Sequence, residues 1–233
     1  MRLNRFLALA EISSRRGAEE YIREGRVTVN GEPSTDLATQ VSPDDRVQVD
    51  GRLVRVQEFV YVLFNKPAGF ITTRSDEKLR KTIYDLLPAR LRNLTHVGRL
   101  DRESEGLLIL TNDGDLAFRI THPKFKLEKE YLVTLDREFQ PEDAAKTRKG
   151  VYLSEGRARF DAIRKINPYQ VRVVLTQGLK RQVRRVLATL NYKVKRLQRT
   201  RIGPLTVRDL GPGEIRLLSK QEIDSLARRA REQ

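Results

Sequence analysis

From residue 59 onward, short apolar runs alternate with turns and brief helical segments, and this alternation restricts the fold more than any other feature of the chain. The runs with the length and composition of β-strands are FVYVLFNKP (59–67), GFITT (69–73), LLILT (107–111), KEYLVTL (129–135) and YQVRVVLT (169–176). The strands are joined mainly by short turns, whereas a doubly wound parallel sheet needs a long crossover after each strand. We therefore predict an α+β domain built on a mixed, mainly antiparallel sheet.

Short helices are predicted between and after these strands. Thr82 can cap a helix in TIYDLLP, and Ser219 and Glu222 have the spacing of a capping box for the last helix. The strand predicted in RARFDAIRKI (157–166) is expected to pair with YQVRVVLT. The predicted helical segments are 82–88, 112–122, 141–150, 180–190 and 219–232.

The first 50 residues have the signals of a separate small unit. LNRFLALA (3–10) places apolar residues at i, i+3, i+4 and i+7, the spacing of an amphipathic helix. Ser13 or Ser14 can cap a second helix, and Gly25 can end it.

Two hairpins complete this unit. RVTVNGE (26–32) alternates with period two into an Asn-Gly turn, and VSPDDRVQVDG (41–51) leads to an Asp-Gly turn. We therefore predict a small domain over residues 1–58, including its linker, and a larger domain over residues 59–233.

The charge balance indicates the class of partner. The chain has 46 Lys and Arg against 31 Asp and Glu, a formal net charge of +15 and a pI of about 10.3. Such an excess favours a polyanion, above all nucleic acid, or an acidic membrane surface. No apolar run approaches the roughly 20 residues of a membrane span. Because no signal peptide is visible either, we expect a cytoplasmic protein.

The residue inventory excludes several chemistries. The chain has no cysteine and only two histidines, His96 and His122, so disulfides, thiol catalysis and cysteine zinc sites are excluded. Neither histidine lies near a nucleophile-elbow sequence, and there is no glycine-rich phosphate loop. An enzyme with this composition would depend on carboxylates, Tyr, Lys and Arg.

Charged residues crowd the segment VGRLDRESEGLLILTNDG (97–114), directly before its apolar strand. One interpretation is a solvated turn. Another is a magnesium site for a nuclease, formed by Asp101, Glu103 and Glu105 with Asp113 or Asp115. The neighbouring arginines, Arg99 and Arg102, would repel a divalent cation and argue against the metal site.

A basic segment without acidic residues extends from Thr176 to Arg208 and contains ten Lys and Arg. Within it, Val183, Val186, Leu187 and Leu190 form a helical core stripe. Arg181, Arg184 and Arg185 fall away from this stripe, with Lys180 at its flank. Guanidinium groups in this arrangement can bind phosphates or a carboxylate.

Four ordered motifs resemble those of bacterial ribosomal-RNA pseudouridine synthases that carry an N-terminal S-four domain. GRLDRESEGLLILTNDG resembles the central motif, NKPAGFITT the first, KEY (129–131) the tyrosine motif and VVLTQGLKRQVRRVL the third. The helices and hairpin of residues 1–50, including SSRRGAEEYIREGRVTVNG, resemble the S-four domain itself. The resemblance covers residues 1 to about 218. It departs at Gln177, where the family has an acidic residue.

The resemblance implies roles for named residues. Asp101 would be the catalytic aspartate, Tyr131 the active-site tyrosine, and Arg184 the basic partner that keeps Asp101 ionised. Leu175 would lie beneath the base, although core packing explains it equally well. The remaining substrate-binding residues would be Arg99, Lys180, Arg181 and Arg185, and the RNA-binding arginines of the S-four unit would be Arg5, Arg15, Arg16 and Arg26.

The implied activity is isomerisation of a uridine in ribosomal RNA, more probable in the large subunit, by a monomer that needs neither metal nor cofactor. Two alternatives from other classes stay open. A non-catalytic RNA-binding or ribosome assembly factor would tolerate the loss of Asp101. A metal-dependent RNA nuclease would be inactivated by EDTA.

Overall fold

The structure is a computed structural model that describes residues 1–230. The chain divides into two compact units, Met1–Phe59 and Val60–Gln233. The small unit has a hydrophobic core of its own, built around Leu3, Leu7 and Ile22. No helix in the described part of the chain is long and apolar enough to cross a membrane.

The small unit contains two helices and a four-stranded sheet. Its elements are α1 (Leu3–Leu9), α2 (Arg15–Arg23), β1 (Val27–Val29), β2 (Glu32–Pro33), β3 (Val47–Val49) and β4 (Arg52–Leu53), and the strand order is β2-β1-β3-β4. The Ser14 side chain caps α2 by accepting a hydrogen bond from the Gly17 amide. Asn30 and Gly31 both have positive φ, as a two-residue hairpin of type I′ requires. The predicted helices and hairpins are therefore confirmed.

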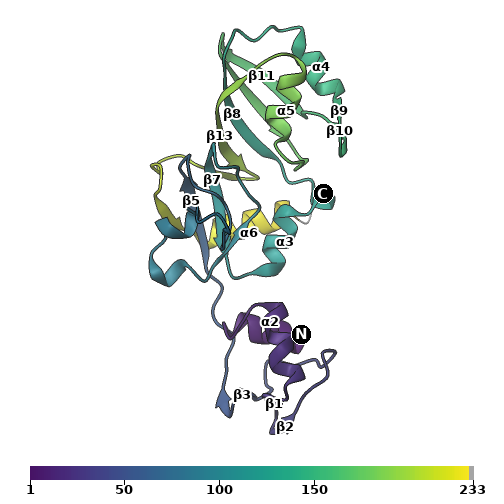
Figure 1. The fold of residues 1–233 in the computed structure, drawn as a ribbon, viewed down its shortest axis with the longest axis vertical. Helices are drawn as coiled ribbons and strands as arrows, with labels where there is room; N and C mark the ends of the chain where they lie inside the picture. Colours follow the sequence, from purple (N-terminus) through teal and green to yellow (C-terminus); the bar gives the residue numbers. More distant parts are fainter. Residues whose placement is uncertain (231–233) are drawn as a thin grey trace. The chain divides into compact units, whose positions relative to one another are not determined.

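The large unit is built on a nine-stranded sheet and a separate hairpin (Figure 1). Its strands are β5 (Tyr61–Lys66), β6 (Thr95–Val97), β7 (Ser104–Thr111), β8 (Lys129–Leu135), β9 (Val151–Leu153), β10 (Gly156–Ala158), β11 (Ala162–Asn167), β12 (Gln170–Leu175), β13 (Val194–Ile202), β14 (Leu205–Thr206) and β15 (Ile215–Leu217). The main path is β11-β12-β8-β13-β7-β5-β15, with β14 paired to β13 and β6 to β7, while β9 and β10 form the hairpin. Among the described strand pairs only β13 and β7 run parallel, so the predicted α+β class with a mixed, mainly antiparallel sheet is confirmed.

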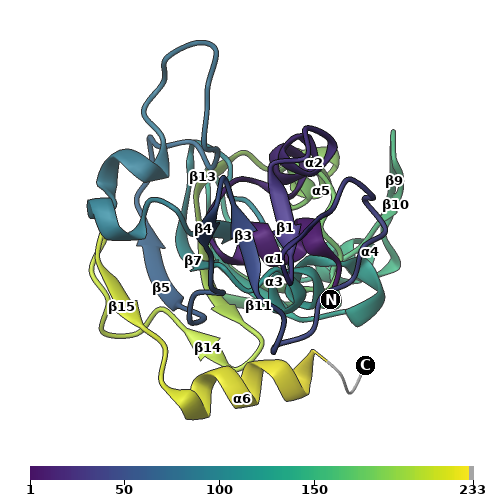
Figure 2. The ribbon, with the colours of Figure 1, turned by 90° about the horizontal axis from the view of Figure 1, so that it is seen from below.

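Short helices cover the sheet of the large unit. They are α3 (Gly114–Thr121), α4 (Asp143–Lys149), α5 (Gln182–Thr189), α6 (Lys220–Arg229) and the 3₁₀ helices η1 (Ile83–Leu86), η2 (Ala89–Leu91) and η3 (Pro123–Phe125). Figure 1 shows α3 and α6 beside the β7 half of the sheet, where both contribute to one hydrophobic cluster, and α4 and α5 beside its β11–β8 half. In Figure 2 α6 runs along the lower edge of the view. The capping boxes at Thr82 and at Ser219 are both present. The last helix was predicted to extend to residue 232, and its final predicted turn lies partly outside the described residues.

The second half of β7, residues 107–110, is continuously apolar because both of its faces are buried. Leu107 and Ile109 pack with residues of α3 and α6, whereas Leu108 and Leu110 pack with residues of η1 and η2. A strand covered on two sides cannot show the polar alternation of a half-exposed strand. The run LLILT is therefore the centre of the large unit, and the charged segment before it is fixed to a rigid element.

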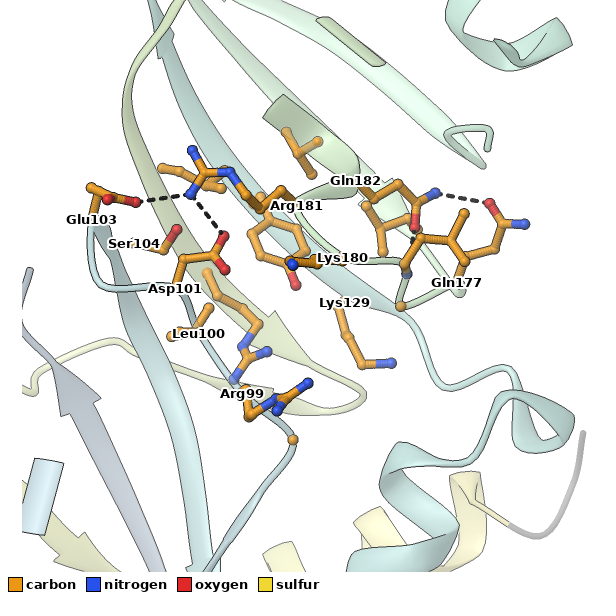
Figure 3. A pocket seen from close by; sticks show the side chains of 18 of the residues that line it. Arg99, Leu100, Asp101, Glu103, Ser104, Lys129, Gln177, Lys180, Arg181 and Gln182 are labelled. Carbon is orange, nitrogen blue, oxygen red and sulfur yellow. Dashed lines mark hydrogen bonds and ion pairs between the residues drawn. The ribbon is translucent and has the colours of Figure 1, made fainter. Parts of the chain in front are cut away.

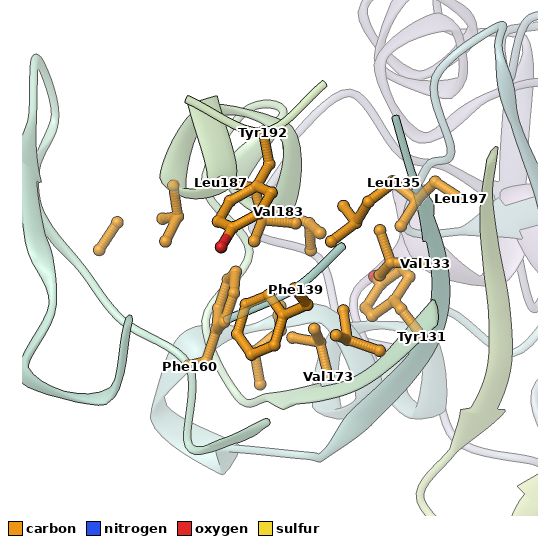
Figure 4. Close-up of a cluster of buried hydrophobic side chains, with 14 of the residues drawn as sticks. Tyr131, Val133, Leu135, Phe139, Phe160, Val173, Val183, Leu187, Tyr192 and Leu197 are labelled. Carbon is orange, nitrogen blue, oxygen red and sulfur yellow. The ribbon is translucent and has the colours of Figure 1, made fainter. Parts of the chain in front are cut away.

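A second core lies under α5. Its valine and leucine side chains, including Val183 and Leu187, pack on residues of β8 and β12, such as Val133 and Val173 (Figure 4). The predicted stripe of α5 is thus the buried face, although α5 begins only at Gln182, after Arg181.

Three strand predictions were wrong. RARFDAIRKI (157–166) is not one strand, since its first residues belong to β10, which pairs with β9, and only β11 pairs with β12. GFITT (69–73) forms only one bridge, between Ile71 and Thr82, because Gly69 has φ +94° and Thr72 bonds to a loop instead of a neighbouring strand. Strand β13 was not predicted, since VKRLQRTRI (194–202) carries a charge at almost every second position. It nevertheless lies between β7 and β8.

Candidate active site

A cavity of about 770 Å³ opens at the loop that precedes β7. Its wall includes Asp101 from this loop, Tyr131 from β8 and Leu175 from the end of β12. The segment between β12 and α5 closes another side, and β13 contributes Leu197 and Arg199. The structure therefore brings three sequence motifs and an unpredicted strand to one cavity (the Asp101 cavity).

The Asp101 carboxylate faces the start of α5 (Figure 3). Arg181 Nη1 lies 3.8 Å from Asp101 Oδ2 and 3.0 Å from Glu103 Oε2. The Asp101 side chain keeps 36% of its surface exposed, so a substrate group can reach it. The charged partner of Asp101 in the described residues is Arg181, which the sequence assigned only to substrate binding.

The buried lysine of the first motif holds the Asp101 loop by its backbone. Lys66 is fully buried, and its Nζ donates hydrogen bonds to the carbonyl oxygens of Pro67 (3.0 Å), Asp101 (3.2 Å) and Ser104 (2.6 Å). Burial lowers the pKa of Lys66 to about 8, while the nearby charges of Asp101 and Glu105 oppose this shift. Lys66 thereby fixes both ends of the turn that carries the catalytic candidate.

Two further residues of the first motif bind the same loop. The Thr72 hydroxyl donates to the Leu100 carbonyl (2.9 Å) and accepts from the Leu100 amide (3.3 Å). The Gly69 amide donates to the Arg102 carbonyl (2.7 Å). The segment NKPAGFITT therefore supports the Asp101 loop by hydrogen bonds. Because its polar groups bond to this loop, the segment does not continue as a strand.

Gly106 lets β7 and β13 approach each other beside the cavity. Its φ is +103°, and an added Cβ would lie 2.3 to 2.9 Å from the backbone oxygen, nitrogen and carbonyl carbon of Arg199. No real Cβ contact is this short, and backbone atoms cannot move aside as a flexible side chain can. Glycine is the residue that fits here.

We expect Gly106→Ala to lower the free energy of unfolding by about 3 to 5 kcal/mol, since it combines overpacking with positive φ. Gly69→Ala is the matched control, because Gly69 has φ +94° with open space around its Cβ position; it should lose only about 1 to 2 kcal/mol. Urea unfolding of both variants measures the difference. Equal losses would mean that the close approach of β7 to Arg199 carries no energetic weight.

Tyr131 and Leu175 lie at the edge of the core and on the cavity wall at once. Their exposed fractions are 9% and 3%, and both belong to the cluster under α5 (Figure 4 labels Tyr131). Core packing and contact with a base are therefore compatible for both residues. Tyr131 thus presents an aromatic side chain to the cavity, and aromatic side chains commonly stack on a flipped base.

Arg184 lies behind the Asp101 loop. Its Nη1 donates to the Val194 carbonyl (2.9 Å) and its Nη2 to the Glu103 carbonyl (3.3 Å). Burial and the charge of Arg181 lower the pKa of Arg184, whereas the charges of Glu103 and Asp101 raise it. Arg184 thus acts on Asp101 at longer range than Arg181 does, and it also supports the loop backbone.

The other basic candidates separate into two groups. Arg99 and Lys180 are exposed and line the cavity, together with Arg181. Arg185 points away: it forms an ion pair with Glu155 of the β9–β10 turn (2.7 Å) and donates to the Ser154 hydroxyl (2.9 Å). The structure therefore does not bring Arg185 to the cavity.

Gln177 replaces the acidic residue of the family motif and has a structural role on the cavity wall. Its Oε1 accepts hydrogen bonds from the Arg159 amide (3.0 Å) and from Gln182 Nε2 (2.8 Å), and its Nε2 donates to the Arg157 carbonyl (3.2 Å). The donated hydrogen bond is one that a carboxylate could not make. The amide therefore fits this position.

The carboxylates considered as magnesium ligands do not gather around one point, because they have separate partners. Glu103 pairs with Arg181 and Glu105 with Arg196. Asp113 caps α3 and accepts a hydrogen bond from the Tyr61 hydroxyl. In residues 1–230 no group of three or more His, Asp or Glu side chains is arranged to hold a metal ion.

The arginines of the small unit differ in their surroundings. Arg15 and Arg16 are exposed at the start of α2, and no salt bridge within residues 1–230 involves them. Arg26 is exposed but is held by Asp50 (2.7 Å) and Glu24 (3.2 Å) and stacks over the Tyr21 ring. Arg5 is half-buried in α1. Arg15 and Arg16 are therefore the candidates best placed to meet an anion.

The polar residues of the cavity region that sequence reasoning missed include Lys66, Ser104, Lys129 and Arg199. Lys66 and Lys129 stand in quoted motifs, so a search for lysines inside strands would have found them. Arg199 had no such signal, because the strand that buries it was itself not predicted.

Comparisons with known proteins match both units. The model of the RNA pseudouridylate synthase family matches residues 60–189, and the S4 domain model matches residues 1–47. The chain is 41% identical over 234 residues to an uncharacterised RNA pseudouridine synthase of Aquifex aeolicus, covering 97% of this chain and 93% of that protein.

Two further relatives extend over nearly the full chain. The ribosomal large subunit pseudouridine synthase B of Bacillus subtilis is 34% identical over 231 residues, covering 97% of this chain and 95% of that protein. A crystal structure of a pseudouridylate synthase superposes with a TM-score of 0.72 at 32% identity, covering 97% of this chain and 99% of that chain.

Proposed function

Because this chain belongs to the RNA pseudouridylate synthase family, we propose that it isomerises one uridine of large-subunit ribosomal RNA to pseudouridine. The family and the S4 resemblance predicted from the sequence are confirmed. The choice of ribosomal RNA, and of its large subunit, is supported by the name of the Bacillus subtilis relative. A ribosomal RNA substrate also favours a cytoplasmic location, and we propose that a monomer acts.

The observation that supports this proposal best is the position of Asp101. Its carboxylate lines a cavity whose wall carries Tyr131 and Leu175, and basic side chains surround the opening. A uridine can enter such a cavity only after leaving its stack, which costs a few kcal/mol. The apolar wall and the tyrosine ring can return this energy.

The reaction breaks the bond between C1′ and N1, turns the uracil, and forms a bond between C1′ and C5, after which C5 loses its proton. We propose that Asp101 is the reacting carboxylate, whether it attacks the sugar, attacks the ring or promotes elimination. Arg181 would pair with Asp101 while the site is empty, and Arg184 would hold the loop. Arg99, Lys180 and Arg181 would contact the phosphates around the flipped nucleotide.

A map of pseudouridines in ribosomal RNA tests the substrate assignment. RNA from cells with and without this protein should differ at a single uridine of the large subunit, and adding the purified protein to the unmodified RNA should restore that site. A difference located in small-subunit RNA, or in transfer RNA alone, would refute the assignment while leaving the family membership intact.

The two alternative functions make opposite predictions. A ribosome assembly factor would need the basic surfaces but not the Asp101 carboxylate, and a nuclease would cleave RNA in the presence of magnesium. The dispersed carboxylates of residues 101–115 give no support to the nuclease. The family membership favours the isomerase over both.

We propose that the S4 unit supplies affinity for RNA rather than catalysis. The hydrophobic clusters of residues 60–230 contain no residue from the small unit, so the large unit should fold alone. A protein lacking residues 1–58 should keep its thermal transition and its tritium release from short RNA. On full-length RNA its KM should rise about 10- to 100-fold, because the contacts of Arg15 and Arg16 are lost.

The double variant Arg15→Gln, Arg16→Gln is the matched control for this deletion. It keeps the small unit folded, since neither side chain contributes to the core, and it should reproduce part of the rise in KM. An unchanged KM in the deleted protein would show that the S4 unit does not bind this RNA.

A further inference from the structure

Two buried polar groups of the Asp101 cavity lack hydrogen-bond partners. In residues 1–230 the buried side-chain atoms without a partner are Asn4 Oδ1, Ser104 Oγ, Arg184 Nε and Arg199 Nη2. Ser104 and Arg199 are 1% and 3% exposed, and both line the Asp101 cavity. Buried polar groups are almost always hydrogen-bonded, so an unpartnered pair in one cavity calls for an explanation.

Both groups are held firmly by the sheet. Arg199 Nε donates to the Leu107 carbonyl (2.7 Å), which fixes the guanidinium on the floor of the cavity. Arg199 is opposite Gly106 on β7 and opposite Tyr131 on β8. Ser104 begins β7, and its carbonyl accepts the short bond from Lys66.

The potential on this side of the cavity is positive. Lys129 also lines it, and burial together with the charge of Arg199 lowers the pKa of Lys129 to about 8. The Lys129 Nζ makes one hydrogen bond, to the Leu127 carbonyl (3.0 Å). A guanidinium, unlike this lysine, stays charged at every working pH. A ligand atom that gains negative charge is therefore stabilised beside Arg199.

The deep burial of Arg199 and Ser104 restricts the kind of ligand that fits them. A backbone phosphate is bulky and tetrahedral, and exposed Arg99, Lys180 and Arg181 can bind it without desolvation. With 3% and 1% exposure, Arg199 and Ser104 can be reached only by a small, planar acceptor. A ring carbonyl of uracil has this shape.

The chemistry requires such an acceptor site. When the C1′–N1 bond breaks with its electron pair on the base, the negative charge spreads over N1 and the oxygens O2 and O4. If Asp101 adds to C6 instead, the pair moves toward the C4 carbonyl. Every route open to Asp101 thus places charge on a ring oxygen, and preorganised donors in a buried site stabilise such charge strongly.

We propose that Arg199 and Ser104 bind one carbonyl oxygen of the flipped uracil and stabilise the negative charge that this oxygen gains while the base is detached. This inference rests on the proposed function and adds two substrate-contacting residues to it. It also explains why Gly106 must be glycine: the missing Cβ lets β13 place Arg199 against the reacting loop.

The test combines substitutions in the enzyme with substitutions in the RNA and asks whether their effects on the rate depend on each other. RNA fragments carry uridine, 2-thiouridine or 4-thiouridine at the mapped position, and the rate of conversion is measured in single turnovers. Sulfur accepts hydrogen bonds weakly. Arg199→Gln should slow the conversion of uridine about 100- to 1,000-fold, and Ser104→Ala about 10-fold, with Kd for RNA nearly unchanged. When sulfur replaces the uracil oxygen that Arg199 and Ser104 bind, the rate decrease caused by each substitution should be about 10-fold smaller or absent.

Controls separate this role from a structural one. Arg201→Gln changes an arginine of the same strand that pairs with Glu128 and does not line the cavity, and it should leave all rates within about 3-fold. Ser104→Ala keeps the test decisive if Arg199→Gln does not fold. Equal slowing of all three RNAs, or no slowing at all, overturns the inference. Failure of the unchanged protein to convert uridine overturns the proposed function as well.

Discussion

Asp101→Asn is expected to abolish tritium release from C5 of uridine in ribosomal RNA, a loss of about 10,000-fold or more, as when a reacting group is removed from an active site. The amide keeps the size of the side chain but cannot supply the negative charge. RNA should still bind, and the protein should stay folded, because Asp101 contributes only a partly exposed ion pair of 3.8 Å with Arg181. Full activity would end the proposed role of Asp101.

Glu103→Gln and Glu105→Gln are the matched controls, since both carboxylates flank Asp101 and each already has a cationic partner, Arg181 for Glu103 and Arg196 for Glu105. Both variants should keep most of the activity, with EDTA present throughout. Loss of activity in all three variants, or a requirement for magnesium, would support the carboxylate metal cluster instead. We expect one inactive variant and two active ones.

Affinity for RNA is expected to fall about 1,000-fold between 50 and 200 mM salt, measured as Kd by filter binding. Of the ten basic residues between Thr176 and Arg208, six have exposed side chains, namely Lys180, Arg181, Lys193, Lys195, Arg196 and Arg208. A protein with 6 to 10 phosphate contacts loses roughly 1,000- to 100,000-fold over this range, because binding releases counterions. Six contacts place the expected loss at the lower end.

Single charge changes test the same surface. Lys195→Gln should weaken binding of RNA. It should also lower the slope of log K against log salt concentration by about the amount that one phosphate contact contributes. Arg185→Gln should change the slope less, since Glu155 already neutralises this guanidinium. A flat salt titration of the unchanged protein would mean that the basic segment does not face RNA.

The outlines of the elements could be read from local sequence. The Asn30–Gly31 turn, the Ser14 cap and the apolar run of β7 depend on residues that are neighbours in the chain. The order of the four motifs likewise identified the family, because each motif is a short run of neighbouring residues.

Contacts between distant segments could not be read in this way. Lys66 binds carbonyls 35 and 38 residues further along the chain, and nothing near Lys66 indicates that its ammonium would be buried. Asp101 meets Arg181 rather than Arg184 because α5 begins after Arg181, which has φ +51° and turns out of the helix toward the loop. Helical periodicity alone could not place this residue.

The sequence by itself determined the fold class and the family, since these depend on periodicity, turn chemistry and short motifs. It also supplied Asp101 as the candidate for the reacting carboxylate. Only the tertiary structure decided which cations face that carboxylate and that Arg199 is buried in the cavity floor. Local pattern describes VKRLQRTRI as an exposed basic segment, yet pairing of β13 with β7 on one side and with β8 on the other removes Arg199 from water. Burial is a property of strand neighbours, and those neighbours lie far apart in the chain.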